Sequence, residues 1–416
     1  MIDLIVNGED KVGKQLGGII KINRIQKGLT LKYISYKTGL SISYLSKVER
    51  NLEGINEKNI SNIFKLMDIE VYNENIFKSY EQEFQKFCRD VVFTLDFHQS
   101  YKILLKYEKY IHSSHYYISY LLAKFIYSIS SNQIVKPKEY LFIEKYLYYL
   151  EDYQIQIYYY YLAVTYYMMD NFNQALEYYY ISEKYKGTTL TRAMLNYHLA
   201  TTLVYKGNVS KAIECACYSR DIFAKTGNIK RLVAINGLIA YAYSLSGNYK
   251  EATELFLSCI EGFQALSMKP QLMSAYNNLL YHYIRTENYQ EIIDYIPSIP
   301  KEYLLDPRIV FYNALAFYKL DQMNQSKYYI KEAKHKCGKT TSRYTKSCIR
   351  MLETLLSHAN MERKEKAMLN MKKVAYDSND KDAILIVLKL IKDFYKESGQ
   401  DEKMMGCIAE ISKLHF

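Results

Sequence analysis

Four asparagines recur along the middle of the chain, in segments that read as helices. They are Asn196, Asn236, Asn277 and Asn313, spaced 40, 41 and 36 residues apart. Asparagine is a poor residue for a helix interior, so its recurrence calls for a reason. A side-chain amide offers two donors and an acceptor, which suits it to hold both groups of a peptide backbone. The alternative is that all four are polar helix-face residues in an Asn-rich protein.

No residue pattern in the chain predicts catalysis or metal binding. A phosphate-binding Gly-rich loop, an HExxH pair and a nucleophile elbow are all missing, and the eight histidines are scattered. Cys215 and Cys217 form the only close cysteine pair, and no second Cys or His pair accompanies them. We therefore expect a protein that is not an enzyme, with no cofactor, no metal and reduced thiols.

The positive charge of the chain is concentrated near its beginning. The formal net charge is +11, and residues 11–50 contribute +8 of it, with Glu49 as their only acid. Such a concentration is typical of a module that binds a polyanion. A Lys-rich composition from AT-rich coding would not remove acids from this segment alone. The nine basic residues are Lys11, Lys14, Lys21, Arg24, Lys27, Lys32, Lys37, Lys47 and Arg50.

Four helices are expected in the first seventy residues. Residues 13–27 form the first, which Gly28 ends. Thr30 caps a second helix that stops at Gly39, and Ser41 caps a third. Asn56 starts the fourth. A helix, a short turn with glycine and another helix form the arrangement that places a recognition helix in the major groove of DNA.

Residues 13–70 resemble the XRE/Cro-type helix-turn-helix at most of its signature positions. Three positions depart from that pattern, namely Asn23, Leu31 and Asn51. The resemblance implies a five-helix domain with an internal ion pair between Arg24 and Glu49. The matching residues are Leu16, Gly17, Ile20, Arg24, Gly28, Leu29, Thr30, Ile34, Ser35, Gly39, Leu40, Ser41 and the run from Leu45 to Arg50.

The DNA contacts follow from the third helix of this arrangement. Ser43 and Lys47 should project from its outer face, while Lys32 and Arg50 should meet the phosphates that flank the groove. The full set of expected DNA-binding residues is Lys32, Ser41, Ile42, Ser43, Tyr44, Ser46, Lys47 and Arg50.

Beyond residue 77 the pattern becomes a repeat of helical hairpins. A small residue opens the second helix of successive hairpins, and a polar turn precedes it. The pattern is that of tetratricopeptide repeats, about eight or nine in number, which stack into a right-handed superhelix. Runs of tyrosine, such as those at 146–161, are expected to pack inside the hairpins. The second-helix positions are Ala175, Ala212, Ala252, Ile292, Ser326 and Ala367.

The order of these parts resembles the peptide-pheromone regulators of Gram-positive bacteria, the RRNPP group that includes Rgg, PlcR, PrgX and NprR. We expect an all-α chain with a DNA-binding domain at 1–72, a linker at 73–79 and the repeats at 80–416. The resemblance implies a cytoplasmic homodimer, joined through its repeats, that binds double-stranded operator DNA. It further implies control by a short signalling peptide, which the four asparagines would hold in the concave groove. No apolar run is long enough to cross a membrane.

Two other functions fit the sequence. The first is a response-regulator antagonist or phosphatase of the Rap or NprR-like kind, which would act through the helices around 80–150. Gln82, Gln85 and Gln99 are available for that role, and nothing in the sequence chooses among them. The second is a phage or toxin-antitoxin repressor that binds DNA without a peptide ligand.

Overall fold

The protein is all-helical throughout the part of the chain that the computed structural model describes, which is residues 16–70, 74–93, 96–133, 135–377 and 380–414. This confirms the predicted all-α class. Lys11 and Lys14 lie outside the described residues. None of the described helices is long and apolar enough to cross a membrane. The chain divides into two compact units, residues 1–198 and 199–416.

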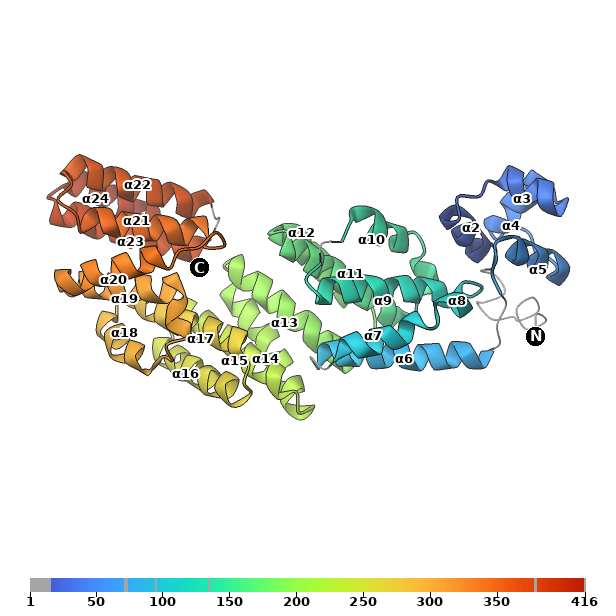
Figure 1. The fold of residues 1–416 in the computed structure, drawn as a ribbon, viewed down its shortest axis with the longest axis horizontal. Coiled ribbons are helices and arrows are strands. Elements are labelled where there is room, and N and C mark those ends of the chain that lie inside the picture. The colour runs from blue at the N-terminus through green and yellow to red at the C-terminus, as the bar shows by residue number, and fades with distance from the viewer. Residues whose placement is uncertain (1–15, 71–73, 94–95, 134, 378–379, 415–416) are drawn as a thin grey trace. The chain divides into compact units, whose positions relative to one another are not determined.

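The first unit contains an N-terminal domain, residues 16–70, and the first helical hairpins (Figure 1). The N-terminal domain consists of α2 (Leu16–Gln26), α3 (Leu31–Thr38), α4 (Ile42–Glu49) and α5 (Glu57–Leu66). The segment expected as a linker is already helical from Glu74. The remaining elements are α6 (Glu74–Val92), α7 (Phe97–Leu105), α8 (Glu108–Ile111), α9 (Tyr116–Ser130), α10 (Pro137–Glu144), η2 (Leu147–Tyr149), α11 (Asp152–Met168) and α12 (Phe172–Glu183).

The second unit is a series of helical pairs, and the unit boundary falls within α13 (Thr189–Tyr205). Consecutive helices run in opposite directions and pack side by side (Figure 1). The elements are α14 (Val209–Lys225), α15 (Ile229–Leu245), α16 (Tyr249–Ala265), α17 (Lys269–Arg285), α18 (Tyr289–Tyr295), η3 (Ile296–Ser298), η4 (Tyr303–Leu305), α19 (Pro307–Lys319), α20 (Met323–His335), α21 (Arg343–Leu355), α22 (Met361–Asp377), α23 (Lys381–Glu397) and α24 (Asp401–Ile411).

The turns inside successive hairpins share one backbone geometry. Gly207 and Gly247 follow α13 and α15 with φ of 77° and 87°, and Asp170, Glu287 and Asp321 take the same left-handed conformation. The next residue then donates its backbone N–H to the carbonyl five residues earlier, as from Asn208 to Leu203 at 2.9 Å. This helix ending satisfies carbonyls that the helix leaves without partners, so the same turn recurs along the chain.

Small residues lie where the second helix of a hairpin contacts its neighbours. Ala175, Ala212 and Ala252 are at most 1% exposed, and Ile292 and Ser326 are fully buried. The last predicted position, Ala367, is only half-buried, and the neighbouring Met368 packs inside instead. The prediction is therefore wrong at that hairpin, because the helix is rotated by one residue relative to the repeat.

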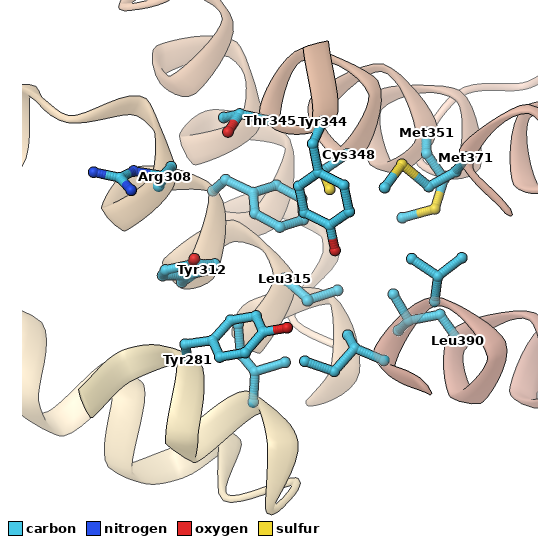
Figure 2. A pocket seen from close by; sticks show the side chains of 14 residues that line it. Tyr281, Arg308, Tyr312, Leu315, Tyr344, Thr345, Cys348, Met351, Met371 and Leu390 are labelled. Carbon is cyan, nitrogen blue, oxygen red and sulfur yellow. The ribbon is translucent and has the colours of Figure 1, made fainter. Parts of the chain in front are cut away.

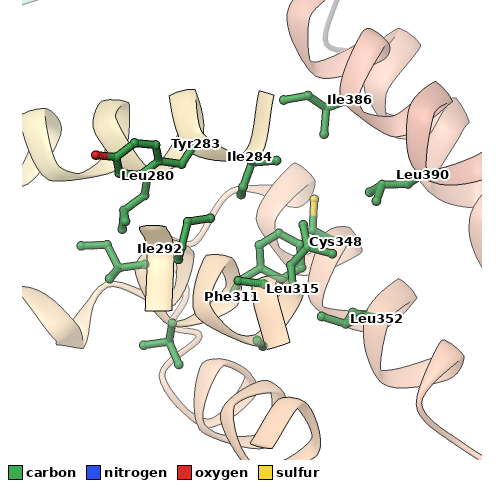
Figure 3. Close-up of a cluster of buried hydrophobic side chains, with 14 of the residues drawn as sticks. Leu280, Tyr283, Ile284, Ile292, Phe311, Leu315, Cys348, Leu352, Ile386 and Leu390 are labelled. Atoms are coloured by element: carbon green, nitrogen blue, oxygen red, sulfur yellow. The ribbon is translucent and has the colours of Figure 1, made fainter. Parts of the chain in front are cut away.

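A continuous core runs through the second unit from α15 to α24. Leu280 and Ile284 from α17 pack with Phe311 and Leu315 from α19, and the cluster continues to Leu390 on α23 (Figure 3). In the first unit the tyrosine runs pack inside as expected. Tyr158 and Tyr160 are 0% and 5% exposed, while Tyr148 is the exception at 52%.

His282 on α17 is a buried titratable group in this core. Its Nδ1 lies 2.7 Å from the Ser244 hydroxyl oxygen, and its Nε2 lies 3.0 Å from that of Thr253. Burial lowers the pKa of His282 to about 4, and burial lowers the pKa of His115 in the first unit to about 4 as well. Both residues are therefore neutral in the folded chain at neutral pH.

These two histidines should make the folded state sensitive to acid. The unfolded chain binds protons at both residues below about pH 6.5, whereas the folded chain binds them only near pH 4. Stability should therefore be full above about pH 6.5 and fall between about pH 6.5 and 4, by on the order of 3 kcal/mol per histidine. His282→Gln should flatten this dependence in denaturant unfolding followed by far-UV circular dichroism. The exposed His335→Gln is the control, and an unchanged slope in the His282 variant would contradict the assignment.

Candidate functional sites

A turn of three residues joins α3 to α4, and a side chain caps the N-terminus of each of these helices. The Thr30 hydroxyl accepts a hydrogen bond from the Tyr33 N–H at 3.1 Å, and the Ser41 hydroxyl accepts one from the Tyr44 N–H at 3.1 Å. Gly39 ends α3 with φ of 75°, a conformation that disfavours residues with a side chain. The turn therefore begins α4 at a defined angle to α3.

An ion pair joins α2 to the end of α4. Arg24 donates from Nε and Nη2 to the two carboxylate oxygens of Glu49, at 2.5 and 2.8 Å, and from Nη1 to the Leu29 carbonyl at 2.9 Å. Glu49 is 6% exposed. The hydrogen bond to Glu49 raises the pKa of Arg24. The pair therefore holds α4 against α2 from inside the domain.

Most residues expected to contact DNA lie on the surface of the N-terminal domain. Tyr44 is only half-buried and its hydroxyl donates to the Gly54 carbonyl at 2.7 Å, so its ring is fixed against the loop after α4. Lys47 lies 3.5 Å from Glu53 in an exposed pair, which contributes little energy. Ser46 is half-buried, and the exposed members are Lys32, Ser41, Ile42, Ser43, Lys47 and Arg50.

Two tyrosines on the outer side of α3 were missed in the sequence. Tyr36 is 82% exposed and Tyr33 is 41% exposed. The Lys37 ammonium lies 5.7 Å from the centre of the Tyr36 ring. Helical periodicity around the buried Ile34 is enough to place both tyrosines on the outer face of α3, so the sequence could have predicted their exposure.

The N-terminal domain packs against the hairpins of the first unit through α2. Asn23 is 1% exposed, and its Nδ2 donates to the His112 carbonyl at 2.7 Å. Its Oδ1 lies 3.0 Å from Nδ1 of His112, and the Tyr117 hydroxyl donates to Gln26. Asn23 thus departs from the apolar family pattern because it contacts another part of the chain.

Gly18 provides a second contact on the same helix. A side chain there would place its Cβ 2.0 Å from the Tyr149 hydroxyl oxygen, so only glycine permits this approach. The Tyr149 hydroxyl also hydrogen-bonds the Asn51 side chain. Tyr149 therefore contacts two different segments of the N-terminal domain.

The four recurring asparagines do not all occupy the same position in their helices. Asn196 and Asn236 are each the eighth residue of a 17-residue helix, α13 and α15. Asn277 is the ninth residue of α17, and Asn313 is the seventh of α19. One residue rotates a side chain by about 100° around a helix, so Asn277 and Asn313 are each displaced in phase from Asn196 and Asn236.

The local contacts of the asparagines agree in part. Asn277 is 5% exposed and donates to the Met273 carbonyl at 3.0 Å and to Asp306 at 3.4 Å, while Asn313 is 3% exposed. Asn196 donates to the Arg192 carbonyl at 2.9 Å. Asn236, Asn277 and Asn313 each have a buried Oδ1 that accepts no hydrogen bond from the described residues. The four asparagines therefore differ in burial, but three of them keep an amide oxygen without a hydrogen-bond partner in the described part of the chain, and their role in holding a peptide stays a prediction.

A pocket in the second unit is formed instead by apolar and tyrosine side chains, which we call the groove pocket (Figure 2). It is lined mainly by the first helices α17, α19, α21 and α23, with Met371 from α22, and has a volume of about 50 Å³. Met351 and Met371 on one side have flexible side chains that can adjust to a guest. None of the four asparagines lines it. Its lining includes Tyr281, Tyr312, Leu315, Tyr344, Met351 and Leu390.

Tyrosine hydroxyls provide the hydrogen-bonding groups of the groove pocket. Figure 2 shows the hydroxyls of Tyr281 and Tyr344 directed toward the space between the helices. Burial raises the pKa of both well above the usual value, so both are protonated and can donate. Arg308 lies at the rim and pairs with Asp306 at 2.6 Å.

Helix α23 forms one wall of the groove pocket, and charged groups attach it to earlier hairpins. Asp382 forms a buried ion pair with Arg285 of α17 and accepts a hydrogen bond from the Tyr241 hydroxyl at 3.3 Å. Lys389 reaches Glu287 at 2.9 Å, and Asp393 of α23 pairs with Lys319 of α19 at 2.7 Å. Burial lowers the pKa of Arg285. Contacts between residues far apart in the sequence therefore set the width of the pocket.

Comparison with known proteins finds likeness in structure only. No family profile and no curated protein matches the chain. A Rap protein complexed with competence and sporulation factor superposes with a TM-score of 0.64 at 13% identity, covering 81% of this chain and 98% of that one. The apo form of the quorum sensor NprR from B. thuringiensis gives a TM-score of 0.63 at 15% identity, covering 81% and 99%.

The chain has the fold of Rap and NprR. NprR in complex with its cognate peptide NprX is also similar, with a TM-score of 0.56 at 16% identity and the same coverage. These matches confirm the tetratricopeptide-like architecture, and with it, at the level of the fold, the resemblance to the peptide-pheromone regulators.

Breaking the buried ion pair of α23 should lower the free energy of unfolding much more than breaking an exposed pair. Asp382→Asn keeps the shape of the side chain and removes the charge opposite Arg285, which should cost about 3–5 kcal/mol. Glu353→Gln removes a partner of Lys334 from an exposed pair and should cost about 0–1 kcal/mol. Denaturant unfolding followed by circular dichroism measures both. Equal losses in the two variants would show that Asp382 does not hold α23 in place.

Proposed function

We propose that this chain is a DNA-binding transcriptional regulator whose activity is controlled by a short peptide bound in its repeats. The observation that carries the proposal is the pair of capped helices α3 and α4, three residues apart, in a chain with the fold of Rap and NprR. In this proposal residues 16–70 are a helix-turn-helix domain of the XRE type, and α4 is its recognition helix.

The charges of the N-terminal domain suit a phosphate backbone. Among residues 16–50 there are seven basic side chains and one acid, Glu49. Because Glu49 is buried against Arg24, the exposed charges of this segment are all positive. Such a surface attracts DNA independently of its sequence. The exposed basic residues are Lys27, Lys32, Lys37, Lys47 and Arg50.

Sequence preference would come from the outer face of α4. Ser43 and Lys47 are exposed on that face, four residues apart, and can reach base edges. Ser41, Ile42 and Ser46 remain in the proposed interface. Tyr44 can contribute only from its fixed position against Gly54. We further propose two chains per operator, joined through the repeats, because one small domain makes too few contacts for tight binding.

The DNA-binding proposal predicts two classes of variant. Lys32→Ala and Arg50→Ala should weaken binding to all sequences and lower the slope of log affinity against log salt by about 0.9 for each phosphate that the variant no longer neutralises. Ser43→Ala and Lys47→Ala should change the preferred sequence, at about 1–3 kcal/mol for each base that is no longer recognised. Fluorescence anisotropy at several salt concentrations, with fragments selected from a random library, measures both.

The exposed Lys65 on α5 provides a matched control for charge. Lys65→Ala should leave the salt slope within the error of the wild-type value. If Lys65→Ala lowers the slope as much as Lys32→Ala does, binding is not localised to α3 and α4, and the recognition-helix assignment fails.

The groove pocket provides the chemistry for a peptide. Its apolar wall of Leu315, Met351 and Leu390 can take one aliphatic or aromatic side chain. The hydroxyls of Tyr281 and Tyr344 can donate to backbone carbonyls of an extended chain. The structures of NprR with NprX and of a Rap protein with competence and sporulation factor support a peptide ligand for this fold. We therefore propose that the pocket side chains hold the peptide, and the second candidate set for its backbone is Asn196, Asn236, Asn277 and Asn313.

The peptide proposal is tested with the peptide that mass spectrometry identifies in protein purified from its own cells. Tyr281→Phe removes one hydrogen bond and should weaken binding about two- to tenfold, whereas Leu390→Ala should weaken it more because it removes apolar surface from the pocket wall. Asn236→Ala should bind as the wild type does, since Asn236 does not line the pocket. Calorimetry measures all three. If Asn236→Ala alone abolished binding, the peptide would be held by the recurring asparagines and not by the groove pocket.

A Rap-type antagonist or phosphatase remains the second candidate function. Its support is the likeness to a Rap protein and the exposure of Gln82, Gln85 and Gln99 on α6 and α7. Gln85 already donates to Glu81 at 3.2 Å, so the other two are the freer side chains. A repressor without a peptide ligand is the third candidate, and it would follow if no peptide accompanies the purified protein.

A further inference from the structure

The first unit contains a polar pocket that neither DNA binding nor the groove pocket uses. It lies among α6, the start of α9, η2 and the start of α11, and has a volume of about 320 Å³. We call it the carboxylate pocket. Its lining includes Glu81, Gln85, His115, Tyr149, Glu151 and Tyr153. Its volume is at the lower end of the range for small-molecule sites, about 300–1,000 Å³.

One side-chain oxygen of Glu81 accepts hydrogen bonds, and the other accepts none from the described residues. Its Oε1 accepts hydrogen bonds from the Tyr153 hydroxyl and from Gln85 Nε2. Its Oε2 is buried and has no hydrogen-bond partner among the described residues. A buried acceptor without a donor destabilises a folded chain, so the site favours a guest that donates to this oxygen.

The carboxylate pocket also lacks a positive charge. Neither Glu81 nor Glu151 forms an ion pair with a described residue, and no lysine or arginine lines the pocket. The titratable base in the lining is His115, whose pKa is lowered to about 4 by burial, and its Nδ1 has no hydrogen-bond partner in the described chain. The lining therefore presents two carboxyl groups and no lysine or arginine, and its histidine is neutral at neutral pH.

We propose that the carboxylate pocket binds a small organic cation, with an ammonium or guanidinium group that donates to Glu81. These groups carry several N–H donors with a positive charge, and charge-assisted bonds to a carboxylate are stronger than neutral ones. Glu151 supplies a second carboxylate for a ligand with a second amino group. A neutral or anionic molecule of the same size gains no such attraction.

Tyr149 connects the carboxylate pocket to the N-terminal domain. Its side chain lines the pocket, and its hydroxyl contacts Gly18 of α2 and the side chain of Asn51. A ligand that moves or immobilises the Tyr149 ring therefore changes the packing of α2 against the first hairpins. Any effect on DNA affinity depends in addition on the proposed function, whereas binding of the cation does not.

Binding is tested by calorimetry on the full chain with putrescine and agmatine as probes. The diol and the dicarboxylate of the same chain length are the matched neutral and anionic compounds. We expect binding of at least one cation and of neither control. Glu81→Gln should weaken the cation by about ten- to a hundredfold, and Glu151→Gln should weaken it independently. Glu83→Gln is the control variant, since Glu83 lies on α6 and does not line the pocket.

The link to the N-terminal domain is tested by hydrogen exchange of α2. The bound cation should change exchange at residues 16–26 in the wild type, and Tyr149→Phe should bind the cation while losing that change. No heat with either cation, equal binding of the diol, or full affinity in both Glu81→Gln and Glu151→Gln would overturn the proposal. Unchanged α2 exchange on binding would overturn the link alone. DNA affinity enters neither readout, so failure here and failure of the proposed function are distinguishable.

Discussion

A helical hairpin of this chain can bury its apolar face only against the next hairpin, and the rest of the structure depends on that constraint. Stacking requires close approach, which Ala212 and Ala252 allow because each is at most 1% exposed. It also requires a constant angle within each pair, which the left-handed residue after the first helix provides. The first helices of successive hairpins therefore lie next to one another along a unit. In the second unit, side chains on the face that these helices share line the groove pocket.

Polar contacts are placed where one packed element meets another. Arg24 and Glu49 hold α4 to α2, Asn23 and His112 hold α2 to the first hairpins, and Arg285 and Asp382 hold α23 to α17. Apolar packing tolerates small shifts between elements, whereas a buried charge or amide is satisfied in one arrangement only. In this chain such groups therefore set the orientation of the parts, and apolar burial supplies most of the stability.

The sequence predicts features that depend on neighbouring residues. The α3 and α4 caps, the turns near Gly207 and Gly247 and the buried alanines all follow from a few adjacent positions. The spacing of the four asparagines does not show their phase on the helices, because one residue rotates a side chain by about 100°. The groove pocket was not predictable, since contacts such as Lys389 with Glu287 join residues 102 positions apart. The partner of Asn23 is 89 positions away, so its departure from the family pattern had no visible cause in the sequence.

The central claim is that a peptide in the repeats controls DNA binding by the N-terminal domain. The most direct measurement is the affinity of the full chain for its selected DNA fragment, with and without a saturating amount of the co-purifying peptide. A coupling of about 1–3 kcal/mol corresponds to a change of about 5- to 150-fold, and we predict a change in this range. A variant with a disrupted groove pocket should bind the same DNA and show no such change. A peptide that saturates the chain and leaves its DNA affinity unchanged would contradict the claim.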